Sequence, residues 1–366
     1  MDATIEQRLF AKAAGTHTPI SAGIELLPLC NMDCDMCFVR LGTEEMKRAG
    51  SVHSADEWLK LAENMQKAGT LFLMLTGGEP LLYPEFKRLY RSLKQMGFVI
   101  TVNTNGTLID DEWADFFAQY PPRRMNITLY GADADTYRSL CHYEDGYEKA
   151  IRAIQLLRDR KVDVKINVSM VKDNQDDIQK LITYADEVGA GISIDTYMYP
   201  AVRERERKYD DQVRVDAKEA ARGKLDFLRT TTEREQYQEI LREHIMRKHE
   251  TEAEQSVEMK MNCQAGKTSF AVNWQGFMRP CVMMTQPSYP VFEMDFLDAW
   301  KKLSKELDKI RLGEDCASCE YRKVCSICPA KAYWETGSIK KKPEYLCRYT
   351  KELFCLMEKE WESYHG

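Results

Sequence analysis

The sequence lacks the features that would direct it to a membrane, to secretion or to nucleic acid. Its first twenty residues carry Asp2 and Glu6 and have no apolar run typical of a signal peptide. No stretch approaches the eighteen consecutive apolar residues of a membrane-spanning helix. Basic residues are not in excess, because 52 Lys plus Arg stand against 58 Asp plus Glu, for a net charge of −6. We therefore expect a cytoplasmic protein that binds neither membrane nor nucleic acid.

Cysteine, in contrast, is abundant, with twelve residues in the chain. Without a secretion signal a disulfide framework is not expected, so binding of metal ions or iron–sulfur clusters explains the cysteines better. Ten of the twelve fall into two groups, one from Cys30 to Cys37 and one from Cys263 to Cys347. The other two, Cys141 and Cys355, are expected to be buried as small apolar side chains rather than to bind metal.

The region between residues 20 and 200 alternates short apolar, β-rich runs with amphipathic helical segments. This alternation is typical of βα units around a parallel sheet. Ser54 and Glu57 form a capping box before one predicted helix, and Pro84 and Gly97 mark the two ends of the next. The six predicted strands cover residues 24–28, 71–76, 98–103, 125–130, 162–169 and 192–197.

A chain of 366 residues is long enough for one large and one small domain. We predict an α/β fold: an N-terminal extension (1–19), a partial (β/α)6 TIM-like barrel (20–200), a charged helical connector (201–260) and a small cysteine-rich iron–sulfur domain (261–366). The connector is rich in Arg, Glu and Lys. The last region has little periodicity, so metal binding is expected to contribute to its stability.

The first cysteine group, Cys30, Cys34 and Cys37, forms a C-x3-C-x2-C motif directly after the first predicted strand. Four-iron clusters take four ligands, so three thiolates would leave one iron open to a small molecule. The alternative, a zinc site, would lack a nearby fourth ligand. The motif resembles that of the radical S-adenosylmethionine (SAM) superfamily, in which an aromatic residue such as Phe38 usually follows the third cysteine.

A second motif, at the end of the second predicted strand, resembles the GGEP motif of that superfamily. Its glycines would let the backbone approach a ligand closely, and Glu79 would pair with the amino group of SAM. Taken alone, the two glycines would indicate only a βα turn. The residues of the motif are Thr76, Gly77, Gly78, Glu79 and Pro80.

Polar residues also stand at the ends of later strands, where barrel enzymes place their ligand-binding loops. The resemblance implies that Asn103, Thr104 and Ser169 contact the ribose and adenine of SAM. The alternative, that each satisfies a local backbone group, stays open. The sequence assigns no general acid or base, because several candidates occupy equivalent positions: Tyr130, Asp195 and Tyr197.

The second cysteine group has seven members, which nearly fill two four-iron clusters, whereas two zinc sites would need eight ligands. Its four closely spaced members would resemble a zinc knuckle if taken alone. The whole arrangement resembles the SPASM domain of radical SAM enzymes that modify peptides and proteins, although two residues rather than three separate Cys325 from Cys328. The resemblance implies a first auxiliary cluster, for which an open iron stays an alternative, and a second, with these ligands: Cys263, Cys281 and Cys328; Cys316, Cys319, Cys325 and Cys347.

These resemblances together imply a radical SAM oxidoreductase with three [4Fe-4S] clusters that cleaves SAM to a 5′-deoxyadenosyl radical. The implied substrate is a peptide or protein, in particular a ribosomally made peptide, and the implied product is oxidative, such as a thioether or carbon crosslink. The implied reductant is a flavodoxin or ferredoxin. Because only about twenty residues precede the first predicted strand, recognition of a leader peptide would use a separate leader-binding protein, the stretch 202–259 or the loop 199–207.

Two other functions are compatible with parts of the sequence. A sulfatase-maturating, formylglycine-forming enzyme would have an acidic residue directly after the second SPASM cysteine, where Val282 stands. A non-enzymatic iron–sulfur or zinc protein, acting as a scaffold or electron carrier, would not need the motif that ends in Glu79 and Pro80, since a carrier has no SAM pocket.

Overall fold

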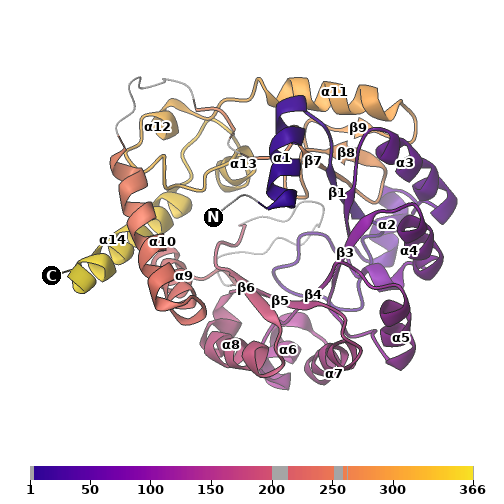
Figure 1. The fold of residues 1–366 in the computed structure, drawn as a ribbon, viewed down its shortest axis with the longest axis horizontal. Helices are drawn as coiled ribbons and strands as arrows, with labels where there is room; N and C mark the ends of the chain where they lie inside the picture. Colours follow the sequence, from indigo (N-terminus) through magenta and orange to yellow (C-terminus); the bar gives the residue numbers. More distant parts are fainter. Residues whose placement is uncertain (1–3, 200–212, 251–258, 262, 366) are drawn as a thin grey trace.

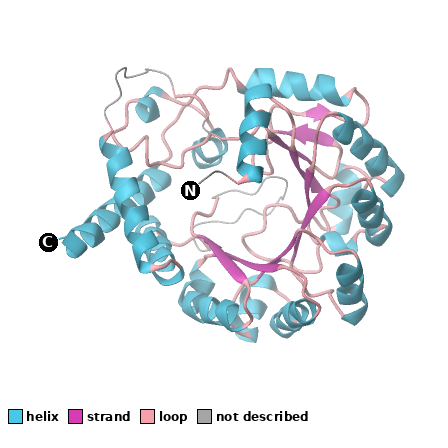
Figure 2. Ribbon diagram, in the orientation of Figure 1, coloured by secondary structure: helices cyan, strands magenta, loops and turns pink. Residues whose placement is uncertain are grey.

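The computed structural model describes residues 4–199, 213–250, 259–261 and 263–365. Its centre is a curved sheet with the strand order β6-β5-β4-β3-β2-β1-β7-β8-β9, in which the strands from β6 to β7 are parallel. Figures 1 and 2 show that helices α3 to α8 cover the convex side of the sheet, while loops fill its concave side. The predicted partial barrel of six βα units is therefore confirmed.

The strands follow the predicted positions closely, with one exception. The first strand begins and ends three residues earlier than predicted: Leu26 and Leu27 lie beyond it, where the Leu26 amide donates to the Thr76 carbonyl and the Leu27 carbonyl accepts from the Gly78 amide. The strands are β1 (Ser21–Glu25), β2 (Phe72–Thr76), β3 (Val99–Thr104), β4 (Arg124–Thr128), β5 (Val164–Ser169), β6 (Gly191–Asp195), β7 (Ser269–Val272), β8 (Phe277–Arg279) and β9 (Tyr289–Pro290).

Capping residues fix the helix starts on the convex side. The predicted capping box of α3 is present, since Ser54 Oγ accepts a hydrogen bond from the Glu57 amide and Glu57 accepts one from the Ser54 amide. The barrel helices are α2 (Thr43–Ala49), α3 (Ala55–Lys67), α4 (Phe86–Gln95), α5 (Asp111–Gln119), α6 (Ala134–Cys141), α7 (Gly146–Asp159) and α8 (Ile178–Glu187), with short 3-10 helices η1 (Pro80–Leu82) and η2 (Lys172–Asp177).

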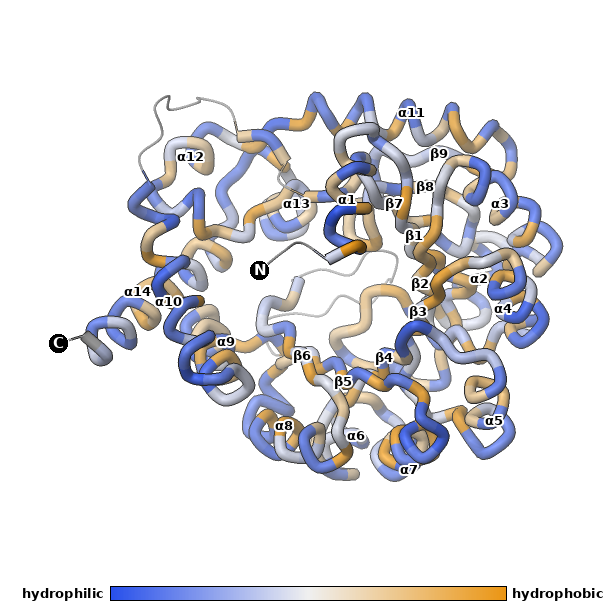
Figure 3. The backbone as a smooth tube through the Cα atoms, in the orientation of Figure 1, coloured by the Kyte–Doolittle hydropathy of each residue, from blue (hydrophilic) through white to orange (hydrophobic). Residues whose placement is uncertain are grey.

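The two faces of the barrel sheet differ in polarity. Alternate strand residues that face the helices are buried and apolar, as in Leu73 and Leu75 of β2. The opposite face, toward the centre of the barrel, carries amides that bond across strands: Asn126 Nδ2 donates to Asn103 Oδ1 at 2.8 Å, and Ser193 Oγ donates to Asn167 Oδ1 at 2.9 Å. The alternation is visible along the strands in Figure 3. The barrel interior is therefore polar enough to bind a hydrogen-bonding ligand.

The charged region after the barrel forms two helices, α9 (Ala217–Thr231) and α10 (Arg234–His249), while residues 200–212 and 251–258 lie outside the described part. Most of the predicted loop 199–207 falls outside it as well. Both helices pack against the C-terminal helix α14 (Glu344–His365), as Figure 1 shows. No helix of the described residues is long and apolar enough to cross a membrane.

The cysteine-rich region is joined to the barrel by its sheet. Strand β7 pairs in parallel with β1, with Ser21 opposite Ser269, and β8 and β9 extend the sheet antiparallel. Buried aromatic side chains, including Phe270, Trp274 and Trp300, give this region a larger apolar core than its sequence indicated. Its helices are α11 (Phe296–Leu307), α12 (Glu314–Ala317), α13 (Pro329–Thr336) and α14, and the N-terminal extension adds α1 (Ile5–Thr16).

Candidate iron–sulfur and SAM site

The first three cysteines lie on the loop that follows β1, and their sulfur atoms accept hydrogen bonds from neighbouring amides. Cys30 Sγ accepts from the Met32 amide at 3.4 Å, and Cys37 Sγ accepts from the Arg40 amide at 3.4 Å. Cys34 is buried, and the other two are half-buried. Burial raises the pKa of the Cys30 thiol, and the nearby Glu79 and the other two cysteines raise it further. The three thiols are therefore gathered in one small volume.

The GGEP segment pairs, backbone to backbone, with the residues that lead into the cysteine loop. The Gly78 amide donates to the Leu27 carbonyl and the Glu79 amide donates to the Leu29 carbonyl, both at 2.8 Å. A Cβ atom on Gly78 would lie 2.2 Å from the Leu29 carbonyl oxygen, so only glycine fits at this position. The two motifs predicted from the sequence are thus adjacent in space, one residue before Cys30.

Glu79, in the segment that follows β2, is fully buried beside the end of β3. Its carboxylate accepts hydrogen bonds from Thr104 Oγ1 at 2.7 Å, from the Asn105 amide at 2.8 Å and from the Leu81 amide at 3.0 Å. Burial nonetheless raises its pKa from 4.5 to about 7. A carboxylate in this state gains strongly from a cationic ligand, because among the described residues no cation contributes to the shift of its pKa.

The other predicted SAM-binding residues occupy different places. Thr104 is buried and bonds to Glu79, so it positions that carboxylate, whereas Asn103 faces the barrel interior. Ser169 is half-buried at the end of β5, two strands away from β3, and Phe38 is half-buried directly after Cys37. Their contact with SAM stays a prediction.

Asn105 was not predicted, although it lies beside two predicted residues. Its side-chain amide donates to Asn31 Oδ1 at 2.9 Å and approaches Cys30 Sγ at 3.6 Å, while its backbone amide binds Glu79. It therefore links the cysteine loop to the carboxylate. Its sequence signal was the Asn-Thr-Asn-Gly turn after the third strand, in which every polar residue looked equivalent.

The seven later cysteines separate into two places. Cys263, Cys281 and Cys328 lie close enough for their charges to interact, with Cys281 following β8 and Cys328 capping α13. The Lys331 amide donates to Cys328 Sγ at 3.5 Å. Burial raises the pKa of both Cys263 and Cys281.

The remaining four cysteines line one small cavity between α12 and α14: Cys316, Cys319, Cys325 and Cys347. The Tyr321 amide donates to Cys319 Sγ and Thr350 Oγ1 donates to Cys325 Sγ, each at 3.4 Å. Hydrogen bonds of this kind to cysteine sulfur are typical of iron–sulfur sites. Both sets match the division implied by the SPASM resemblance, and their roles as ligands stay a prediction.

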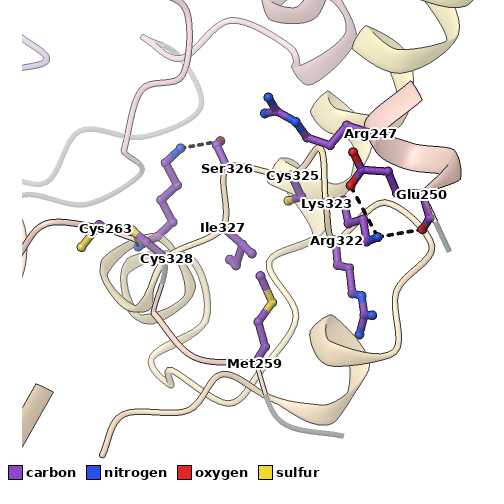
Figure 4. Close-up of a pocket in the computed structure, with 11 residues that line it drawn as sticks. Arg247, Glu250, Met259, Cys263, Arg322, Lys323, Cys325, Ser326, Ile327 and Cys328 are labelled. Carbon is purple, nitrogen blue, oxygen red and sulfur yellow. Dashed lines mark hydrogen bonds and ion pairs between the residues drawn. The ribbon is translucent and has the colours of Figure 1, made fainter. Parts of the chain in front are cut away.

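A larger cavity of about 830 Å³ opens between the two cysteine sets. Figure 4 shows Cys263 and Cys328 at one end and Arg247, Arg322 and Lys323 at the other. Lys331 also lines the cavity; it donates to Ser326 Oγ at 2.8 Å, and its ammonium lies 4.3 Å from the centre of the Tyr197 ring. The Lys331 ammonium therefore interacts with the Cys328 thiol, while at the other end of the cavity Glu250 pairs with Lys323 at 3.7 Å.

A buried ion pair connects the barrel to α13. Arg214 and Glu335 lie 2.7 Å apart with side-chain exposures of only 4% and 8%. The Tyr197 hydroxyl also donates to Glu335 at 2.6 Å, and the Arg214 guanidinium lies 3.3 Å from the centre of the Tyr345 ring. Since Cys328 caps the start of α13, the ion pair and the Tyr197 hydrogen bond hold the helix that follows one predicted cluster ligand near the end of β6.

The donor set fits iron–sulfur clusters. No three His, Cys, Asp or Glu side chains of the described residues are placed to hold a single metal ion. Ligands of a four-iron cluster sit on different iron atoms, so they stand farther apart than the ligands of one ion. Of the two remaining cysteines, Cys141 is buried as predicted, whereas Cys355 is exposed on α14, so its predicted burial is wrong.

Comparisons with known proteins define the class of the chain. Residues 24–185 match the model of the Radical SAM superfamily. The range contains both the cysteine loop and the GGEP segment. Residues 24–185 are therefore a radical SAM domain, and the cysteine-rich region follows it in the chain.

Three similar proteins cover nearly the whole chain. The AdoMet-dependent heme synthase of Methanosarcina barkeri is 26% identical over 353 residues, which span 92% of this chain and 98% of the relative. The structure of Streptococcus suis SuiB bound to S-adenosylmethionine has a TM-score of 0.67 at 17% identity, over 93% of this chain and 81% of SuiB. The structure of anSMEcpe with bound AdoMet has a TM-score of 0.68 at 19% identity, over 94% and 98%. The two structures share the fold.

The raised pKa of Glu79 predicts a pH-dependent difference in stability between the protein and its Glu79→Gln variant. A buried carboxyl whose pKa rises from 4.5 to about 7 stabilises the fold fully below pH 4.5, and this stabilisation is lost as the pH rises through 7. Without added SAM, the free energy of unfolding of the variant should therefore rise by about 3 kcal/mol relative to that of the wild type between pH 4.5 and pH 8. Urea unfolding at both pH values measures this difference, and a constant difference would contradict it.

Proposed function

We propose that the protein is a radical SAM enzyme that abstracts a hydrogen atom from a peptide or protein substrate and leaves an oxidative modification. The observation that carries this proposal is the separation of the seven later cysteines into a set of three and a set of four beside the barrel. It is supported by the fold shared with SuiB bound to precursor peptide SuiA and with anSMEcpe bound to the Cp18Cys peptide.

The residues around β1 and β2 would bind and orient the cofactor. Cys30, Cys34 and Cys37 would hold a [4Fe-4S] cluster and leave one iron for the amine and carboxylate of SAM. Glu79 would accept a hydrogen bond from the SAM ammonium, which lowers its raised pKa and keeps the carboxylate ionised. When bound, SAM and this cluster supply the 5′-deoxyadenosyl radical, and the barrel excludes water from it.

The C-terminal cysteines would hold two auxiliary clusters, which supply an acceptor for the electron that the substrate loses. Cys263, Cys281 and Cys328 provide three ligands, so a substrate group or another donor would complete the first site. Lys331, which acts on Cys328, makes its surroundings more favourable for an anionic group. A flavodoxin or ferredoxin would supply the first electron, and a separate protein would bind a leader peptide if the substrate has one.

Heme synthesis is the second candidate function. It is favoured by the similarity to the heme synthase, which extends over 98% of that protein. The formylglycine-forming alternative remains less favoured, because Val282 stands directly after Cys281 where an acidic residue would be expected. To separate the first two functions, candidate precursor peptides and iron porphyrins are each added with SAM and reductant. The substrate is the compound that increases deoxyadenosine formation and itself changes in mass.

The first test counts iron and sulfide in anaerobically purified, reconstituted protein and in a variant with Cys30, Cys34 and Cys37 all changed to Ala. We expect about twelve irons per chain in the wild type and about eight in the variant. In the presence of a reductant, only the wild type should form deoxyadenosine from SAM. Cys355→Ala, which removes an exposed thiol, is the control and should change neither value. Fully loaded wild type that forms no deoxyadenosine would contradict the proposal.

A further inference from the structure

The turn that follows β3 carries buried polar side chains that bond to the cysteine loop. Asn105 is 6% exposed and Thr107 is 8% exposed, so their polar groups need partners within the protein. The partner of both is Asn31, the residue directly after Cys30. Asn105 Nδ2 donates to Asn31 Oδ1 at 2.9 Å, and Asn31 Nδ2 donates to Thr107 Oγ1 at 2.8 Å. Side chains thus join the turn to the cysteine loop.

These three side chains close a hydrogen-bonded ring, which Thr107 Oγ1 completes by donating to Asn105 Oδ1 at 2.7 Å. The backbone amide of Thr107 donates to the same oxygen at 2.9 Å. Because an amide N–H can only donate, this bond determines which atom of the Asn105 side chain is the oxygen. The direction of every bond in the ring follows from it. Each member therefore donates one hydrogen bond and accepts one, which strengthens the ring as a unit.

The ring reaches two parts of the proposed SAM site through Asn105. The Nδ2 atom has a second hydrogen, and it lies 3.6 Å from the Cys30 sulfur. The backbone amide of the same residue donates to the Glu79 carboxylate at 2.8 Å. One residue thus contacts a proposed iron ligand with its side chain and the proposed acceptor of the SAM ammonium with its backbone.

We propose that the ring holds Cys30 and Glu79 at a fixed separation and thereby sets the affinity of the protein for SAM. Its members are positioning residues. The inference rests on the proposed function, in which the methionyl end of SAM binds both the open iron and Glu79. Two attachment points bind one ligand tightly when they are already ordered at the right separation. Loosening the ring should therefore weaken SAM binding, whereas iron loading should persist because all three cysteines remain.

Thr107→Val tests the ring without touching Cys30 or Glu79. It replaces a hydroxyl by a methyl group, so Asn31 loses an acceptor and Asn105 loses a donor. The dissociation constant of the reconstituted enzyme for SAM, measured anaerobically by isothermal titration calorimetry, should rise about tenfold. Thr107→Ser keeps the hydroxyl and should stay within about twofold of the wild type. In deoxyadenosine formation, Thr107→Val should raise the KM for SAM and leave kcat nearly unchanged.

A second variant and a matched control complete the test. Asn105→Ala removes the side chain that contacts Cys30, so it should weaken SAM binding more than Thr107→Val does. The control is Thr70→Val, because Thr70 is 4% exposed and its hydroxyl donates to the Pro19 carbonyl at 2.6 Å. It also removes a buried threonine hydroxyl, but before the start of β2, at the opposite end of the strand from Glu79. Iron content and SAM affinity should both stay at the wild-type values.

Each outcome decides the proposal. Thr107→Val that loads iron and binds SAM as the wild type does overturns it, as does an equal loss of affinity in Thr107→Ser or Thr70→Val. A fall in the iron content of Thr107→Val also overturns it, because the ring would then serve cluster loading. If Asn105→Ala loads iron poorly, the two Thr107 variants decide, since neither removes a contact to a cysteine. A fully loaded wild type that binds no SAM would instead overturn the proposed function.

Discussion

Gly78→Ala should reduce deoxyadenosine formation roughly 10²-fold, because the added methyl group displaces the cysteine loop. The new Cβ would lie 2.2 Å from the Leu29 oxygen, 2.5 Å from the Leu29 carbon and 2.6 Å from the Pro28 oxygen. All three are backbone atoms directly before Cys30, so no side chain can rotate away to make room. The segment must move by about an ångström, and the three thiols move with it.

Gly191→Ala is the matched control for this prediction. It adds a methyl group to a barrel glycine as well, at the start of β6, but its nearest neighbour would be Lys165 Cγ at 4.0 Å, an ordinary contact. Deoxyadenosine formation and iron content should both be measured, since a displaced loop lowers the first and destabilises cluster binding as well. Activity retained within twofold in Gly78→Ala would show that the pairing of the two motifs does not fix the site.

Glu335→Gln should lower the free energy of unfolding by about 3–5 kcal/mol, since it leaves the buried Arg214 guanidinium without its carboxylate. The two side chains are 4% and 8% exposed, so water cannot replace the lost partner. Tyr197 loses the charged acceptor of its hydroxyl in the same variant. Because α13 carries Cys328 at its start, the variant should also lose auxiliary iron faster when treated with a chelator.

Two further variants separate the buried charge from general disruption. Arg214→Met combined with Glu335→Leu removes both charges and should recover most of the lost stability. Glu239→Gln breaks an exposed ion pair with Arg242 on α10 and should change the free energy of unfolding by less than about 0.5 kcal/mol. Urea unfolding followed by circular dichroism measures all of them, and equal losses in Glu239→Gln and Glu335→Gln would contradict the prediction.

The barrel could be predicted because its signals are local. Alternating apolar runs gave six strands, and the capping box of Ser54 and Glu57 marked the start of α3. The first strand was placed too late because Leu26 and Leu27, which follow the regular strand, are apolar as a consequence of their burial. The packing of α14 against α9 could not be foreseen, because the sequence of each helix does not show which other helix its apolar face contacts.

The same contrast holds in the site. The spacing of the motifs identified Cys30, Cys34, Cys37 and Glu79. It gave no sign that the cysteine loop bonds to the end of α6, where the Cys141 carbonyl accepts from the Asp33 amide, because α6 lies about a hundred residues later in the chain. A lone apolar-looking cysteine carries no sequence signal of its neighbours. The contact of Thr104 with SAM stays a prediction, whereas the bond of its hydroxyl to Glu79 was not foreseen, because it depends on β2 and β3 lying side by side in parallel so that their ends meet.

The pairing of β1 with β7 has a consequence for synthesis on the ribosome. Ser21 and its strand emerge early, but their partner at Ser269 is made only about 250 residues afterwards. At 5–20 residues per second, that edge of β1 stays unpaired for roughly 12–50 s, while β2 already covers the other edge. An uncovered strand edge is prone to pair with other chains. The nascent barrel therefore has a period of exposure in which chaperone binding would protect it from aggregation.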